Sequence, residues 1–452
     1  MALQRLPPSL RVAAAALLFA LVAAPFAYRF VDYAVDDFFI TYRYADNLAD
    51  GDGLVFNPGE RVFGTTAAGL ALLLAAGNGV TGVAIPRLAT ALTWLSLVAL
   101  ATLLFTEAHQ RRRGAEAIAG GLLVVSSLFV WLHNGSEIHP ALLMLAGAAA
   151  LAHLDRPRSD ATAGVLAGFV AWLRPDAVLG TGIVGVLAWW RRRRLPWVYG
   201  VVAAVLLAAG LAAAWAWFGD ALPVTLGAKR LQARWQPGTW PSGLAFWPAA
   251  ARHVGAYSAG RMLWPIVAVG ALGLVPMLRQ GGPAMRALVL YAAALFVAYP
   301  LLGVPLYPWY ALPLLVVLLY GYAFAAGAAA RWLWRLASER GWPRLAAGAL
   351  AAVVVAAAAW PIAVEPGQRS LRTARTGVYP IHTWNYRDAG EAIERFTEPG
   401  TVVAAVEVGT LGYHSDRPIH DLLGLVSPSA LPGVAAGDLA AAFRAGDPDL
   451  FV

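Results

Sequence analysis

The sequence predicts a multi-pass α-helical membrane protein, and three observations lead to this fold class. Of the 452 residues, 59% are hydrophobic and only 13% are charged, whereas soluble globular proteins are about 45–50% apolar and about 25% charged. The mean hydropathy is +0.61. The apolar residues also come in long blocks and do not alternate with polar ones. Together these features exclude a soluble enzyme, a disordered chain and a coiled coil.

Charge and cysteine content narrow the possible functions further. The chain has no cysteine, which excludes disulfides, zinc–thiolate sites and thiol nucleophiles. Its net charge of +8 comes from 34 basic and 26 acidic residues, and Lys229 is the single lysine. In a membrane protein, excess arginine marks topology and anionic headgroups, so we expect no nucleic-acid partner. The arginine, glycine and alanine usage is typical of GC-rich bacterial coding, and we therefore expect the bacterial cytoplasmic membrane.

The apolar blocks predict about 11 transmembrane helices. The first block, Leu10 to Phe30, is long enough to cross the ~30 Å hydrocarbon layer. Although Val22-Ala23-Ala24 resembles a signal-peptide cleavage site, we expect an uncleaved helix. The later blocks centre near residues 85–105, 115–133, 137–153, 160–173, 177–190, 196–218, 262–279, 286–303, 309–328 and 344–363. Because the number is odd, the two chain ends are predicted to lie on opposite sides.

Arginine placement predicts the orientation. With the N-terminus inside, half of the 34 basic residues fall in short cytoplasmic loops, as the positive-inside rule requires. These residues are Arg5, Arg11, Arg111 to Arg113, Arg156, Arg158, Arg191 to Arg194, Arg279, Arg286, Arg331, Arg335, Arg340 and Arg344. Two long polar loops, 31–84 and 219–260, then lie outside.

The predicted domains are a membrane domain over residues 1–364 and a small extracytoplasmic α/β domain over 365–452. In the second, a charged helical run (Tyr386 to Phe396) precedes a β-rich run (Val402 to Val408) and a strand-like piece near Ile419 to Leu423. Short alternating helix and strand patterns favour this class. The chain stops at Phe451-Val452 within another strand-like piece, which leaves open that this domain is incomplete.

The first outer loop begins with two adjacent carboxylates, Asp36 and Asp37. Such a pair beside a membrane is costly to desolvate and repels itself, so it is either a solvated cap or a functional group. The residues after it have helical periodicity, with Phe38 and Tyr42 on one face, and predict an amphipathic helix in the interface. A second apolar stretch, Thr66 to Ala76, is too short to span and favours a re-entrant or surface helix. Two such helices would form a pocket at headgroup depth.

The run DDFFITYRYADNLADGDGLVFNPGERVFGTTA, which starts at Asp36, resembles the first outer loop of the bacterial GT-C glycosyltransferases that use polyprenyl-phosphate sugars. It is most similar to the terminal β-(1→2)-arabinofuranosyltransferase type. Other segments resemble the same family in the same order: NGSEIHPALLML (134–145), LRPDAVLG (173–180), FGDALPVTLGAKR (218–230), YPWYALPLL (307–315) and VEVGTLGYHSDRPIHDLLGLVSP (406–428). The resemblance covers nearly the whole chain. It departs at Ile138-His139, where relatives usually carry Thr-Ala or similar.

This resemblance implies a GT-C-like catalytic membrane domain that moves a sugar from a polyprenyl-phosphate donor to an extracytoplasmic glycan, lipid or protein acceptor. A phosphate leaving group needs cations more than a general acid. One carboxylate then suffices as general base, and direct displacement inverts the anomeric centre. The resemblance implies Asp36 as the base, with Asp37 in support or binding acceptor. We expect no required cofactor, although a divalent cation at Asp36 and Asp37 stays open.

The expected donor-phosphate ligands are Lys229, Arg230 and Arg174. A lysine ammonium is a compact point charge suited to phosphate. For Lys229 the alternative is a lysine that snorkels at the membrane edge, and for Arg174 it is a pair with Asp176.

The expected substrate-binding residues are Glu137, Arg43 and Tyr310. Glu137 is alternatively a buried structural residue, Arg43 a partner of Asp46, and Tyr310 part of an aromatic belt. The histidines His139, His414 and His420 do not have the spacing of metal ligands, and we expect them to be polar surface residues.

Two other functions remain open from the sequence. A transporter or flippase of a lipid-linked sugar would place polar or broken helices at the membrane midplane and often has inverted repeats. A non-catalytic envelope assembly protein would not need the acidic pair.

Overall fold

A computed structural model describes residues 7–31, 33–236, 238–255, 263–340 and 381–452, with the backbone alone for 381–384. The predicted crossing at 344–363, together with Arg5 and Arg344, lies outside these described residues. The described chain is mostly helical.

Helices occur at the predicted apolar blocks of the described chain. They are α1 (Pro8–Arg29), α4 (Ile85–Gln110), α5 (Gly114–Val125), α7 (Ile138–Ala152), α8 (Pro157–Leu173), α9 (Ala177–Arg192), α10 (Trp197–Phe218), α13 (Leu263–Gln280), α14 (Pro283–Leu301) and α15 (Leu312–Glu339). Six helical segments of the described chain are long and apolar enough to cross a membrane: α1, α4, α10, α13, α14 and Pro308–Glu339. The protein is therefore a multi-pass membrane protein.

The block predicted as one helix over 115–133 is broken in the structure. Helix α5 ends at Val125, and a short helix α6 (Leu128–Leu132) follows. The Ser126 hydroxyl donates to the carbonyl of Leu122 at 2.7 Å. Hydrophobicity alone does not locate this break, because the residues on both sides of it are apolar.

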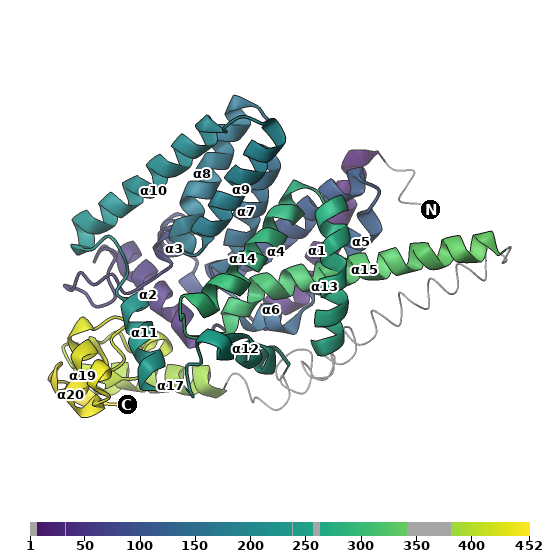
Figure 1. Cartoon of the computed structure of the whole chain (residues 1–452). Coiled ribbons are helices and arrows are strands. Elements are labelled where there is room, and N and C mark those ends of the chain that lie inside the picture. The colour runs from purple at the N-terminus through teal and green to yellow at the C-terminus, as the bar shows by residue number, and fades with distance from the viewer. Residues whose placement is uncertain (1–6, 32, 237, 256–262, 341–380) are drawn as a thin grey trace.

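Close packing of small residues joins the helices. A Cβ on Gly273 would lie within 2.4 Å of the carbonyl carbon of Gly321, and one on Gly270 within 2.6 Å of the Leu318 oxygen. Glycine at these positions lets the backbones of α13 and α15 approach, as is typical of membrane helices. Figure 1 shows α7, α8, α9 and α10 as one group and α13, α14 and α15 as another.

The α7–α8 and α9–α10 turns, which carry several of the predicted inner arginines, lie at the end of the bundle away from the C-terminal elements (Figure 1). Arg113 and Arg331 both contact Glu116. Arg192 pairs with Asp160 at 2.6 Å. Which side faces the cytoplasm stays a prediction from the positive-inside rule.

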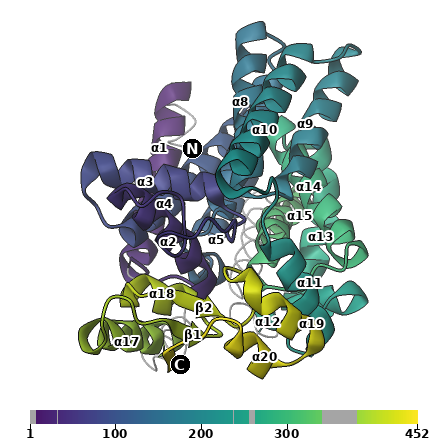
Figure 2. The same cartoon turned by 90° about the vertical axis from the view of Figure 1, so that its left-hand side faces the viewer.

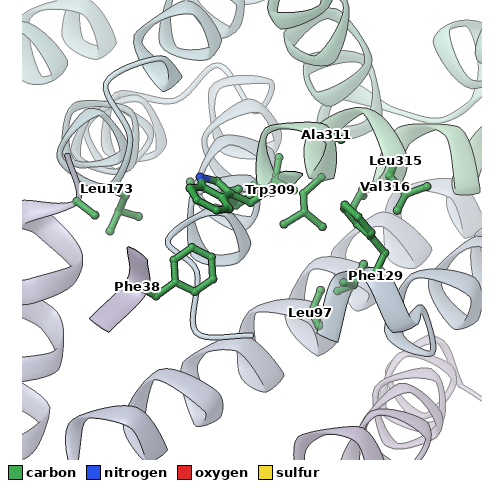
Figure 3. Packing of buried hydrophobic residues seen from close by; sticks show 14 of the residues in the cluster. Phe38, Leu97, Phe129, Leu173, Trp309, Ala311, Leu315 and Val316 are labelled. Carbon is green, nitrogen blue, oxygen red and sulfur yellow. The ribbon is translucent and has the colours of Figure 1, made fainter. Parts of the chain in front are cut away.

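Short elements cover the opposite side of the bundle. They are α2 (Asp36–Asp50), α3 (Ala68–Thr81), α11 (Thr225–Trp235), η2 (Gly243–Ala245), α12 (Phe246–Val254) and η5 (Pro308–Ala311). The ring of Phe38 on α2 packs edge-on against Trp309 of η5, with centroids 5.5 Å apart. Figure 3 shows this pair within the apolar core, near Phe129 and Leu97. The first loop is thus packed onto the helical bundle.

The C-terminal elements contain a small parallel sheet. They are α17 (Ile381–Phe396), β1 (Val403–Ala405), α18 (Gly409–Ser415), β2 (Ile419–Asp421), η6 (Pro428–Ala430), α19 (Leu431–Ala436), α20 (Leu439–Arg444) and β3 (Leu450–Phe451). The strand order is β2-β1-β3, and Val403 pairs with both Ile419 and Leu450. Figure 2 shows these elements beneath α2 and α11.

Candidate functional site

A cavity of about 360 Å³ lies where α2, α11, η5 and the α8–α9 turn meet. Its walls are largely apolar, but several ionisable side chains converge on it. They are Asp37, Glu137, Arg174, Asp176, Lys229, Tyr299 and Tyr310. An apolar cavity with a few convergent polar groups is the usual form of a small-molecule site.

The two adjacent aspartates face different surroundings. Both lie in the first turn of α2, where successive side chains point about 100° apart. Asp37 lines the cavity. The carboxylate of Asp36 instead accepts hydrogen bonds from the backbone N–H groups of Gly409, at 3.0 Å, and Thr410, at 2.7 Å. Loss of hydration raises the pKa of Asp36, and the charge of Asp37 adds to this, while the amide bonds oppose it.

This geometry argues against the expected division of roles. With both oxygens held by amides of α18, Asp36 anchors the C-terminal elements to the first loop. Asp37 is the carboxylate with access to the cavity. Asp37 is therefore better placed than the expected Asp36 to act on a ligand in the cavity.

Lys229 reaches into the cavity from α11. Its ammonium lies 3.5 Å from the Oδ2 atom of Asp37, 3.9 Å from the centroid of the Tyr307 ring and 5.6 Å from that of Trp309. Aromatic faces attract a cation, so the rings hold the ammonium beside the carboxylate. The position is inside the pocket, unlike that of a snorkelling lysine. The next residue, Arg230, is exposed and does not line the cavity, which corrects its expected place in the phosphate site.

Arg174 is held by neighbouring oxygens. Its guanidinium donates to both oxygens of Asp176, at 3.0 and 2.5 Å, to Glu137 at 2.8 Å and to the Tyr299 hydroxyl at 3.0 Å. The pairing with Asp176 is therefore present, and Glu137 joins it. A bidentate pair of this kind fixes a planar guanidinium strongly. Both Arg174 and Glu137 line the cavity. Because its guanidinium is already bonded to two carboxylates, Arg174 is held in place as part of the cavity wall.

The expected roles of two other residues change. The guanidinium of Arg43 donates to the carbonyls of Phe56 at 2.7 Å, Arg417 at 2.8 Å and Gly412. It does not line the cavity, so Arg43 joins the first loop to the C-terminal elements and is removed from the substrate-binding set. Tyr310 does line the cavity, but one face of its ring stacks on Tyr299 with centroids 5.0 Å apart.

The C-terminal elements contribute a wall that the sequence did not reveal. Leu425 lines the cavity. The Asp421 carboxylate accepts N–H bonds from Leu423 at 2.8 Å, Leu425 at 2.5 Å and Val426 at 3.0 Å. These bonds shape the loop that carries Leu425. Burial raises the pKa of Asp421 to about 6. In the sequence, an aspartate at the start of a turn indicates a loop of this kind. It does not indicate that the loop will line the cavity.

A third carboxyl group approaches the acidic pair. Although much of the Glu407 side chain is exposed, its carboxyl end lies near Asp36 and Asp37. Loss of hydration and these two charges raise the pKa of Glu407 to about 8. The resemblance included this segment, but nothing in the sequence placed it beside residues some 370 positions earlier.

The histidine prediction was wrong for two of three residues. His139 and His420 are buried, with 1% and 5% of their surface exposed. The His139 ring contacts the carbonyl of His133 at 3.1 Å, and the His420 ring that of Ala442 at 2.7 Å. Each ring thus has a backbone partner that offsets the cost of its burial.

The acidic pair does not form an evident cation site. Within the described ranges, no group of three or more histidine and acidic side chains is arranged to hold a metal ion. Asp36 is bound by amides and Asp37 by an ammonium, and neither arrangement suits a divalent cation that needs several oxygen ligands. We derive no step through a metal.

Comparisons with known proteins bear on the fold. Residues 377–452 match a family described as Domain of unknown function (DUF8728). None of the curated proteins matches the chain. Among solved structures, ArnT from Cupriavidus metallidurans bound to undecaprenyl phosphate is similar with a TM-score of 0.58 at 16% identity, covering 92% of this chain and 88% of that chain. An oligosaccharyltransferase from Archaeoglobus fulgidus, tethered with an acceptor peptide, has a TM-score of 0.53 at 12% identity, covering 96% and 72%. Both are GT-C glycosyltransferases, so this chain has the GT-C type of fold.

Proposed function

We propose that the protein is an inverting glycosyltransferase that moves a sugar from a polyprenyl-phosphate donor to an extracytoplasmic acceptor. The observation that carries the proposal is the pairing of the Asp37 carboxylate and the Lys229 ammonium on one cavity, at 3.5 Å. A base and a phosphate-binding cation side by side are what a displacement at a glycosyl phosphate requires. The similar ArnT structure holds undecaprenyl phosphate, which supports a lipid-linked donor.

A groove next to the cavity suits the lipid part of that donor. It lies among α8, α9 and α10, measures about 520 Å³, and has almost entirely apolar walls. Val178 lines both the groove and the cavity, so the two spaces are neighbours. We place the donor phosphate at Lys229 and the first isoprene units along this groove.

The reaction follows from these positions. Asp37 takes the proton from the acceptor hydroxyl while the acceptor oxygen forms its bond to C1 of the sugar. The bond from C1 to the phosphate oxygen breaks on the opposite face, and its electron pair leaves with the polyprenyl phosphate. Lys229 balances the charge that develops on the phosphate. The anomeric centre is inverted, and the proton ends on Asp37.

The location of the ionisable groups favours this function over transport. Asp37 and Lys229 lie on α2 and α11, outside the six long apolar segments. A transporter would place its site near the membrane midplane. The resemblance noted in the sequence makes arabinofuranose the first donor sugar to test, with a wall glycan, a lipid or a protein as acceptor.

The test uses purified full-length protein, a bacterial envelope extract as the source of acceptor, and a panel of polyprenyl-phosphate sugars, including arabinofuranosyl and hexosyl donors. We expect one donor to be consumed with release of polyprenyl phosphate, and the Asp37→Asn protein to leave it intact. If liposomes that contain the protein move a lipid-linked sugar across the membrane without releasing polyprenyl phosphate, the transporter function replaces this proposal.

A further inference from the structure

A separate hollow lies where α1 packs beside α4 and α5, away from the proposed transfer site. It measures about 690 Å³ and is bounded by α1, α4 and the start of α5. Its lining is polar at one end, with Arg11, His109 and Arg112, and apolar along its walls, with Leu18 and Ile118 among others. The proposed glycosyl transfer makes no use of this space.

The polar end carries positive charge. Arg11 Nη1 lies 3.2 Å from the Nε2 atom of His109, and Arg112 is exposed at the end of α4. The one carboxylate in the lining, Glu116, is already shared by Arg113 and Arg331. Two guanidinium groups, one of them in contact with His109, thus line the hollow beside a glutamate whose charge is matched from outside it.

The apolar wall runs along the membrane-crossing direction of α1. Ala14 and Leu18 are four residues apart on one face of this helix, and both line the hollow. From Arg11 to Leu18 the helix rises about 10 Å. Leu18 is 39% exposed, so this wall is open to the lipid that surrounds the helix.

We propose that the hollow is a binding site for an anionic phospholipid of the surrounding leaflet. Its phosphate would lie at Arg11 and Arg112, and one acyl chain would follow Leu18 and Ile118. Basic pockets between membrane helices are suited to anionic headgroups. A soluble anion would use only the polar end, whereas a lipid uses both ends. This site does not depend on the proposed sugar transfer.

The test is native mass spectrometry of the full chain in detergent, titrated with phosphatidylglycerol or with phosphatidylcholine. We expect the parent to bind phosphatidylglycerol more tightly. The Arg11→Gln/Arg112→Gln protein should lose about 30-fold in this affinity, from about fivefold for each arginine near a headgroup. The matched control is Arg156→Gln/Arg158→Gln, which removes two exposed arginines from the same side of the bundle and should bind as the parent does.

Two more measurements distinguish a lipid bound in the hollow from an anion bound at the arginines alone. Ala14→Phe keeps both arginines but fills the hollow, and should also lose phosphatidylglycerol. Glycerol phosphate, which has no acyl chain, should compete only weakly. Should Arg11 prove necessary for folding, Arg112→Gln alone should still lower the affinity about fivefold. An equal loss in the control pair, an unchanged affinity in the Arg112 variant, or full competition by glycerol phosphate would overturn the proposal.

Discussion

The ammonium of Lys229 lies 3.5 Å from the Oδ2 atom of Asp37, although 192 residues separate them in the chain. Both side chains are partly buried: Lys229 is 13% exposed and Asp37 is 22% exposed. The attraction between the two charges offsets part of the cost of removing each from water. A donor phosphate that enters the cavity competes with Asp37 for the same ammonium. The proposed base and the proposed phosphate ligand are therefore coupled.

The acidic pair provides the first prediction. Asp37→Asn should lower the turnover rate by about 10²–10⁴-fold, because the amide cannot take a proton, while the protein still folds. Asp36→Asn should cost less in rate, since Asp36 contacts the amides of α18 and does not line the cavity. Initial rates at saturating donor check both. Asp52→Asn, at an exposed position after α2, is the control. A folded Asp36 variant without activity, next to an active Asp37 variant, would restore the role first expected for Asp36.

The second prediction concerns the phosphate. Lys229→Ala should weaken donor binding by about 10- to 100-fold, the range for a hydrogen bond to a charged group, and Lys229→Arg should recover part of it. Binding of a polyprenyl phosphate measures this directly. Arg230→Ala is the matched control, because it removes the neighbouring exposed cation and should leave the affinity unchanged. Equal losses in the two alanine variants would mean that the membrane surface, and not the cavity, attracts the donor.

The third prediction tests the groove. A Cβ on Gly182 would meet nothing within 4 Å, and this glycine lines the apolar groove. Gly182→Leu should therefore fold but narrow the path for the isoprene chain, raising the donor KM with little change in kcat. Gly79→Leu, which likewise meets open space but lies on α3, serves as the control. Unaltered donor KM in the Gly182 variant would place the lipid chain elsewhere.

The fourth prediction follows from Glu407. Its folded-state pKa of about 8 lies well above the value of about 4.3 in an unfolded chain, so the folded protein holds this proton more tightly. Stability should therefore fall as the pH rises from about 4.5 to 8 and stay lower above that. Glu407→Gln cannot ionise, and its melting temperature should exceed that of the parent more at pH 9 than at pH 5. Glu398→Gln, at an exposed position, should show no such difference.

The fifth prediction concerns orientation. A reporter fused after Arg194 should indicate the cytoplasm, because of the arginine cluster that ends there. One fused after Val452 should indicate the outside. Reporters that agree on one side would contradict the predicted number of crossings.

The sequence was informative wherever one physical property dominated. The long hydrophobic blocks predicted helices such as α4 and α10, because a helix that crosses a membrane needs a continuous apolar stretch. The acidic pair at Asp36 and Asp37 stood out because adjacent carboxylates beside apolar spans are unfavourable. The break at Ser126 escaped this reasoning, since the residues on both sides of it are apolar.

The roles within the site depended on contacts that a linear pattern does not contain. Which aspartate faces the cavity is decided by the phase of α2 and by amides that arrive from α18. Arg43 looked like a ligand on an amphipathic helix, but its partners include carbonyls at positions 412 and 417. Only the packed chain brings such partners together.

The bond between Asp36 and the Gly409 amide spans 373 residues, and this separation has a consequence for biosynthesis. At about 5–20 residues per second, roughly 20–75 s pass between the synthesis of the two partners. During that interval the first loop is already made while its anchor is not. Until residues 409 and 410 are made, the first loop lacks the amide contacts that hold Asp36 in the folded protein.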